Sequence, residues 1–205
     1  MPNWVDNKLT IEADKVTIDN IFNKIKSQQF NDSKVYQIAL GLYPMPNDIT
    51  YVMGTGGSEQ YAVLQDKIVR PPSVANFVDK NYDERLEFVD LTEVQKRDLT
   101  EQYGATNWYD WNVKNYGTKW GDCSTELINH EESKLEFVFE SPWSHSAVLA
   151  QRISEDYKAS VELKHYSIEN WEKGMFLFEE GTLHKSEYEL LGDPDEVLVP
   201  VSEEE

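Results

Sequence analysis

The chain is poor in cysteine, in basic residues and in long apolar stretches. Its 205 residues include a single cysteine, Cys123, which excludes an internal disulfide framework and fits a reducing compartment. No apolar run approaches the roughly 20 residues needed to cross a membrane. The opening MPNWVDNKLT has neither the basic start nor the apolar stretch of a signal peptide. We therefore expect a soluble, cytoplasmic protein with no membrane partner.

The sequence patterns of common catalytic and metal sites are also missing. The glycine-rich stretch VMGTGGSEQ lacks the Lys-Ser/Thr of a phosphate-binding P-loop, and Glu59 at its end would repel phosphate. The four histidines are widely spaced, and none lies in a His-Glu-x-x-His zinc helix. Asp122 precedes Cys123 and is expected to raise the pKa of the thiol rather than activate it. The sequence therefore predicts a protein that is not an enzyme and needs no cofactor or metal.

Negative charge is the most unusual bulk property of the chain. Asp and Glu number 38 against 19 Lys and Arg, a net charge of −19. Residues 1–100 carry a net charge of −4, and residues 101–205 carry −15. Such a field repels phosphate backbones, so we expect no direct binding to nucleic acid, and it attracts basic protein surfaces. The alternative is that the acidity only keeps the protein soluble.

Apolar residues alternate or recur in ways that predict a small α+β fold. Strand-like alternation is found in NWVDNKLTIEA, STELINH, KLEFVFES, ASVELKHYSI and GMFLFEEG. TIDNIFNKIKSQQF, with Thr17 as its expected N-cap, and SHSAVLAQRISEDY have helical periodicity. The order strand, helix, strand, strand, helix, strand predicts a ferredoxin-like (split βαβ) antiparallel sheet with helices on one face.

The middle of the chain interrupts this plan. We expect a ferredoxin-like domain over residues 1–30 and 106–192, an insertion or subdomain over 31–105, and an acidic C-terminal tail over 193–205. The insertion is expected to be mixed and partly helical, because TEVQKRDLTEQYG has Thr92 as a cap and Gly104 as a stop.

The stretch NWYDWNVKNYGTKWGDC is unusually rich in aromatic residues. Its spacing predicts a helix over 108–116, with Trp120 on the returning chain folding back over the same face. One interpretation is hydrophobic core, in which the asparagines bond to nearby backbone. The other is a pocket with aromatic walls and amide specificity groups, in a ligand-binding domain or an enzyme. Its residues would be Trp108, Trp111, Asn112, Asn115 and Trp120.

The N-terminal MPNWVDNKLTI and the later YDWNVKNYGTKW resemble the YubB-type ferredoxin-like domain family of phages and conjugative plasmids. The matching positions are Met1 to Trp4, Asn7, Leu9, Tyr109 to Trp111, Asn115 and Gly117 to Trp120. Tyr116 stands where the family tends to have Trp, and ESPWSHS departs from the expected Trp-Ser-Pro-Pro turn. The resemblance covers little of residues 31–105. It implies a mobile-element origin and a ferredoxin-like fold, and it implies no activity.

Together these observations predict a phage- or plasmid-encoded interaction protein in the host cytoplasm. We expect it to bind and inhibit a basic host protein, as an anti-CRISPR or anti-restriction type of anti-defence factor that mimics nucleic acid on a basic surface. The alternatives are the ligand-binding domain or enzyme described above and a structural role in a virion. The oligomeric state does not follow from the sequence. The acidic residues expected to contact the partner are Glu131, Glu132, Glu136, Glu140, Glu179, Glu180, Glu187, Glu189, Asp193, Asp195 and Glu196.

Overall fold

The computed structural model describes residues 3–26, 36–55, 58–64, 67–69, 86–169 and 171–191 of the α+β chain. The chain divides into two compact units. We call Met1–Tyr43 with Asn115–Glu205 the sheet unit and Pro44–Lys114 the inserted unit. The insertion expected over residues 31–105 thus begins and ends later in the chain. One reason is that helix α2 (Ile38–Leu42) is held by the Asp122 carboxylate of the sheet unit.

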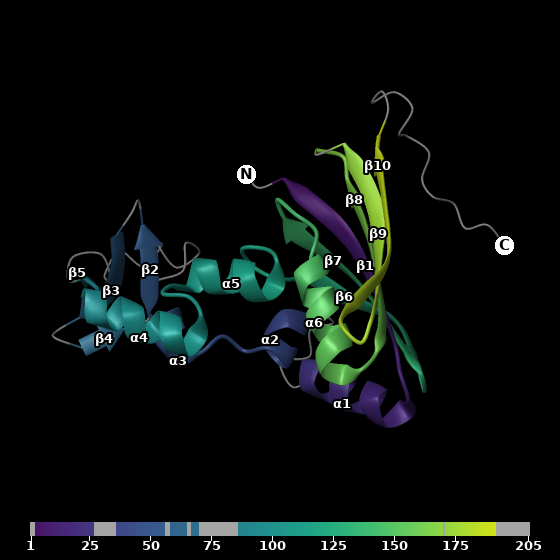
Figure 1. The fold of residues 1–205 in the computed structure, drawn as a ribbon, viewed down its shortest axis with the longest axis horizontal. Coiled ribbons are helices and arrows are strands. Elements are labelled where there is room, and N and C mark those ends of the chain that lie inside the picture. Colours follow the sequence, from purple (N-terminus) through teal and green to yellow (C-terminus); the bar gives the residue numbers. More distant parts are fainter. Residues whose placement is uncertain are drawn as a thin grey trace. The chain divides into compact units, whose positions relative to one another are not determined.

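The sheet unit is built on a six-stranded sheet in which all neighbouring strands are antiparallel. The strand order is β10-β9-β8-β1-β7-β6, so the first strand lies in the middle (Figure 1). The tail expected over 193–205 lies outside the described residues. The strands are β1 (Trp4–Glu12), β6 (Cys123–Glu131), β7 (Lys134–Pro142), β8 (Ser160–Ser167), β9 (Glu172–Glu179) and β10 (Thr182–Leu190).

Alternation along the strands sends one set of side chains into the core. On β7 the aliphatic and aromatic side chains are buried while the intervening Glu136, Val138 and Glu140 are only partly buried, as the sequence predicts. β1 and β8 follow the same pattern. The buried members of this face are Val5, Leu9, Ile11, Leu135, Phe137, Phe139, Val161 and Leu163.

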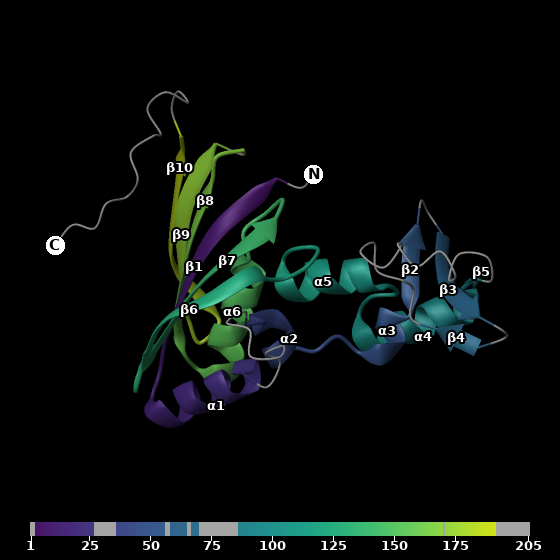
Figure 2. The same ribbon diagram turned by 180° about the vertical axis from the view of Figure 1, so that it is seen from behind.

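Helices α1 (Lys15–Lys26), α2 and α6 (Ala147–Tyr157) cover this apolar face. Each side chain of this kind that leaves water contributes about 1.5–3 kcal/mol before the entropy of ordering is subtracted. None of the sheet unit's described helices lies over the opposite face, as the view from behind also shows (Figure 2). The helical residues that supply the packing are Ile18, Ile21, Ile25, Leu149, Ala150 and Ile153.

The helix boundaries test the expected caps. The prediction of Thr17 as N-cap is wrong, because the Asp14 carboxylate accepts hydrogen bonds from the Val16 and Thr17 backbone N–H groups at 2.9 and 3.0 Å. An aspartate one turn earlier satisfies the free donors of α1 better than a hydroxyl inside it. Thr92 is confirmed as a cap and forms a capping box with Gln95. Gly104 is confirmed as the stop, with a left-handed φ of +73°.

The inserted unit has a smaller antiparallel sheet in which β3 pairs with each of the other three strands. Glu59 on β3 accepts hydrogen bonds from the Thr106 hydroxyl and the Asn107 amide, which ties the start of α5 to this sheet. In the residues described, no helix is both long and apolar enough to traverse a bilayer. The elements are α3 (Asn47–Thr50), β2 (Val52–Thr55), β3 (Ser58–Leu64), β4 (Lys67–Val69), β5 (Leu86–Asp90), α4 (Glu93–Tyr103) and α5 (Trp108–Tyr116), which runs past the unit's last residue.

Candidate functional site

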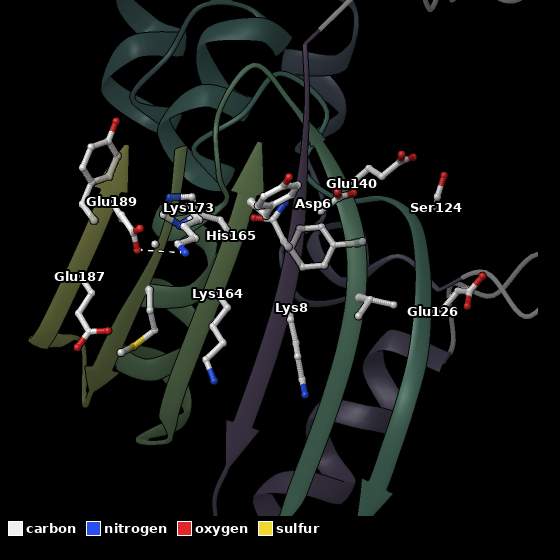
Figure 3. A pocket seen from close by; sticks show the side chains of 17 residues that line it. Asp6, Lys8, Ser124, Glu126, Glu140, Lys164, His165, Lys173, Glu187 and Glu189 are labelled. Atoms are coloured by element: carbon white, nitrogen blue, oxygen red, sulfur yellow. Dashed lines mark ion pairs between the residues drawn. The ribbon is translucent and has the colours of Figure 1, made fainter. Parts of the chain in front are cut away.

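The uncovered face of the six-stranded sheet is hollowed into a groove of about 1150 Å³ (Figure 3). Cross-strand register sets side chains from all six strands in rows across this face. Charged side chains line the groove together with the apolar or aromatic side chains of Val138, Met175 and Tyr166. The charged members are Asp6, Lys8, Glu126, Glu140, Lys164, Lys173, Glu187 and Glu189.

Two carboxylates face each other across neighbouring strands of the groove. Asp6 on β1 is directly opposite Glu140 on β7. Partial burial, with the nearby charge of Glu140, raises the pKa of the Asp6 carboxyl above its ordinary value. Like charges in this position destabilise a sheet. Within the described residues neither side chain has an ion-pair partner.

The nearest lysines of the groove are engaged elsewhere. The Lys8 ammonium lies 3.2 Å from a Glu136 carboxylate oxygen, and the Lys164 ammonium lies 3.0 Å from a Glu162 oxygen. Both side chains therefore extend along the sheet away from Asp6 (Figure 3). The carboxylate pair is left without a neutralising cation from them.

Three indoles form a partly exposed cluster in the sheet unit. The Trp4 and Trp120 ring centroids are 6.1 Å apart, and those of Trp120 and Trp143 are 5.7 Å apart. The Lys119 ammonium lies 5.0 Å and 5.3 Å from the Trp120 and Trp143 rings. Trp120 and Trp143 remain 43% and 47% exposed, which is high for the largest apolar side chain.

Trp143 is also held in an unusual backbone conformation. Its φ of +64° lies in the left-handed region, which a bulky residue rarely adopts. The Trp143 backbone N–H donates to the Asn3 carbonyl at 2.7 Å, and the Ser144 hydroxyl donates to the Gly117 carbonyl at 3.0 Å. These bonds join the turn after β7 to the N-terminal strand and to the loop that carries Trp120.

The pocket residues expected in the aromatic stretch have different surroundings. The helix over 108–116 is confirmed as α5, in which Trp111 and Asn112 are buried and Trp108 is half-buried. The Asn115 carbonyl oxygen accepts a 2.6 Å hydrogen bond from the Arg152 guanidinium. Trp120 packs with Trp4 and Trp143 in the cluster above.

The expected partner-binding acids fall into two groups on the sheet unit. The register row that joins Glu131 to Glu179 runs across one end of the sheet, and Glu132 and Glu180 follow directly in the adjoining turns. Within the second group Glu140, Glu187 and Glu189 line the groove. Asp193, Asp195 and Glu196 lie outside the described residues. The full groups are Glu131, Glu132, Glu179 and Glu180 at the end, and Glu136, Glu140, Glu187 and Glu189 on the open face.

Neighbouring cations neutralise a good part of this surface. Glu132 pairs with Lys15 at 2.6 Å, Glu187 with Lys185 at 2.7 Å, and Glu189 with Lys173 at 3.1 Å. Exposed pairs of this kind contribute about 0–1 kcal/mol to stability, and they lower the net field nearby. The sequence, read without register, did not single out Asp6, which stands beside an unpaired Glu140.

Cys123 has no sign of activation. Burial first, and then the charges of Asp122 and Glu140, raise the pKa of its thiol to about 11. The predicted direction of the Asp122 effect is therefore confirmed, although burial is the larger cause. At neutral pH the thiol is almost wholly protonated and is a poor nucleophile.

A buried histidine pair lies on the helix-covered face of the same sheet. The His145 and His165 ring centroids are 4.5 Å apart, and Phe176 packs against both. Among the residues described, neither ring nitrogen of His165 has a hydrogen-bond partner, and burial, with His145 nearby, lowers the pKa of the ring to about 4. In the ranges described, no three His, Cys, Asp or Glu side chains gather to hold a metal ion. His165 follows Val161 and Leu163 at every second position of β8, and this spacing is the signal in the sequence that marks it as core.

Comparisons with known proteins assign neither a family nor a function to this chain. No family model and no curated protein matches the chain. One solved structure that it resembles is the crystal structure of the protein api92 from Yersinia pseudotuberculosis, family DUF1281, at 12% identity and a TM-score of 0.49. That match covers 94% of this chain and 100% of the other.

Proposed function

We propose that this chain is a non-enzymatic interaction protein that binds and inhibits a basic host protein through the uncovered face of its six-stranded sheet. The observation that carries the proposal is the open groove, which has acidic side chains along it and none of the sheet unit's described helices over it. A sheet face whose described helices all pack on the other side can receive a partner. The excess of negative charge favours a partner with a basic surface and speeds its association.

The partner is a nucleic-acid-binding protein of host defence, and the acidic face occupies the surface that normally holds a phosphate backbone. Support comes from the net charge of −15 over residues 101–205 and from the resemblance to a family of mobile elements. The protein acts in the host cytoplasm. The end group of acids, Glu131, Glu132, Glu179 and Glu180, widens the anionic surface beyond the groove.

We also propose that the sheet unit is of the ferredoxin-like type. Four of its strands follow the order β8-β1-β7-β6, in which the first strand lies between the last and the third of the four. Helix α1 follows β1, and helix α6 connects β7 with β8, as the split βαβ plan requires. The hairpin of β9 and β10 extends the sheet beyond this set.

The test is affinity capture of host proteins by the immobilised chain at low and at high salt. We expect a stoichiometric partner at low salt that is released by salt and by a soluble polyanion such as heparin, because both screen or compete for charge. A chain in which Glu131, Glu132, Glu179 and Glu180 are all glutamine should capture less. Failure to recover any stoichiometric partner at low salt contradicts the proposal.

Binding of a small ligand in the groove is the second candidate, and the volume of about 1150 Å³ favours it. The Trp4 indole, two residues from Asp6 on β1, would report such a ligand. A saturable change in tryptophan fluorescence with a nucleotide or metabolite supports this candidate. Fluorescence that responds only to a basic protein supports the first.

A further inference from the structure

The indole cluster and the carboxylate pair lie at the same end of the six-stranded sheet. Trp4 precedes Asp6 by two residues on β1, and Trp143 follows Glu140 just after the end of β7. Side chains two residues apart on a strand point to the same face of the sheet. Trp4 is therefore on the same face as Asp6, and its ring connects this part of the sheet to the exposed rings of Trp120 and Trp143.

Several features of this end of the sheet cost stability. Asp6 and Glu140 repel each other across the strands. Trp143 has a left-handed φ, and both it and Trp120 leave nearly half of their surface in water. Unfavourable local features of this kind persist where the surroundings hold them for a function. The repulsion of the carboxylates is electrostatic and the left-handed φ of Trp143 is conformational, and both occur at the same end of the sheet.

We infer that this end of the open face is the anchor point for an arginine side chain of the basic partner, an inference that rests on the proposed function. A guanidinium group can bridge two carboxylates through its fork of N–H donors and can stack on an indole at the same time. Binding would cancel the repulsion between Asp6 and Glu140. Arginine and tryptophan are also the residues most enriched among those that dominate interface energies.

The cluster already holds one cation of its own. The Lys119 ammonium lies over the faces of both Trp120 and Trp143, at distances within the range of cation–π attraction. The arginine of the partner takes the carboxylate side of the cluster, at Asp6 and Glu140, where no cation of the groove is bound. Lys8 and Lys164 do not compete, because Glu136 and Glu162 hold them.

Fluorescence anisotropy with a labelled peptide of alternating arginine and serine tests the anchor at about 0.15 M salt, where general charge attraction is screened. The peptide with citrulline in place of arginine is the neutral control. We compare the chain with the double variants Asp6→Asn/Glu140→Gln and Glu179→Gln/Glu180→Gln, which remove the same charge. We expect about tenfold weaker binding for the first and less than about twofold for the second.

A third variant tests the contribution of the aromatic rings to the proposed arginine anchor. Trp120→Leu keeps every acidic residue, and we expect it to bind the arginine peptide about threefold to tenfold more weakly. Thermal unfolding of each variant checks the fold. Asp6→Asn/Glu140→Gln should unfold at or above the temperature of the unchanged chain, so that loss of binding is not loss of structure.

The outcomes separate this inference from the proposed function. Equal weakening by the two double variants overturns the anchor and leaves a diffuse acidic surface. Equal binding of the arginine and citrulline peptides overturns it as well. If the unchanged chain captures a salt-sensitive host partner but has no saturable affinity for the arginine peptide, only the anchor fails. If it captures no partner and binds no peptide, both proposals fail.

Discussion

Asp6 and Glu140 lie directly opposite each other on the neighbouring strands β1 and β7, on the face of the sheet that no described helix of this unit covers. Cross-strand neighbours of opposite charge would stabilise this position, yet both residues are acidic. Burial and mutual repulsion together raise the pKa of Asp6. The pair therefore stores unfavourable energy that a cationic partner can release.

Removal of one charge from this pair should stabilise the free protein. We expect Asp6→Asn or Glu140→Gln to raise the free energy of unfolding by a few tenths to about 1 kcal/mol at pH 7 and low salt. The gain should shrink at high salt, because salt screens the repulsion. Urea unfolding at two salt concentrations measures it, with Glu180→Gln as a control away from the pair. Destabilisation by Asp6→Asn would show that the carboxylate has a favourable partner.

The histidine pair predicts a loss of stability in mild acid. His165 has a pKa of about 4 in the folded chain and an ordinary value of 6.5 when unfolded, so the folded state favours the neutral ring. The contribution of the neutral His165 to the free energy of unfolding is complete above pH 6.5. It is lost as the pH falls from 6.5 towards 4, because in this range the unfolded chain binds the proton and the folded chain does not. Between pH 7.5 and pH 5 we expect this effect of His165 to lower the free energy of unfolding by about 2 kcal/mol.

Urea unfolding of the chain and of His165→Leu at these two pH values isolates the effect. The variant should lose about 2 kcal/mol less over the interval, since carboxylates contribute equally to both proteins. His145, the other titratable ring in the pair, and Glu172, whose charge raises the pKa of both rings, face His165 and remain in the variant. Parallel declines for the two proteins would contradict a buried neutral His165.

The buried Asp122 should be a strong determinant of stability. Its carboxylate accepts hydrogen bonds from the Ile38 and Ala39 backbone N–H groups and from the Thr125 hydroxyl, at 2.5–2.8 Å. Asp122→Ala would leave these donors buried without an acceptor, and we expect a loss of about 2–4 kcal/mol. The exposed cap Asp14 is the matched control, with an expected loss of about 1 kcal/mol for Asp14→Ala. Equal losses in urea unfolding would contradict this role of Asp122.

The exposed indoles can be identified by quenching. Trp120 and Trp143 are 43% and 47% exposed, whereas Trp111 is 6% exposed. We expect acrylamide to quench part of the emission of the chain, and the variant Trp120→Phe/Trp143→Phe to lose most of that accessible part. Trp111→Phe should leave the accessible part almost unchanged. The reverse result would place the open aromatic surface on α5.

Local sequence patterns predict the helices and strands of this fold better than they predict which of these elements lie next to each other. Alternation along residues 135–140 and the helical spacing of 108–116 identify β7 and α5, because both depend only on side chains close in sequence. Thr17 illustrates the limit even at short range, since Asp14 competes for the same backbone donors and wins.

The candidate site depends on register, which the sequence alone does not give. Asp6 and Glu140 meet because β1 pairs with β7, and a shift of one residue would put Glu140 on the other face. The meeting of Trp4, Trp120 and Trp143 likewise depends on a strand, a loop and a turn far apart in the chain. The overall charge predicts a basic partner, whereas the place of contact needs the structure.

Chemical-shift mapping of the isotope-labelled chain during titration with the arginine peptide tests the account most directly. We expect the largest changes at the backbone amides of Asp6 and Glu140 and at the indole N–H groups of Trp4, Trp120 and Trp143. Amides around Glu179 and Glu180 should change little. Changes spread evenly over the acidic residues, or confined to the inserted unit, would contradict binding at this end of the open sheet face.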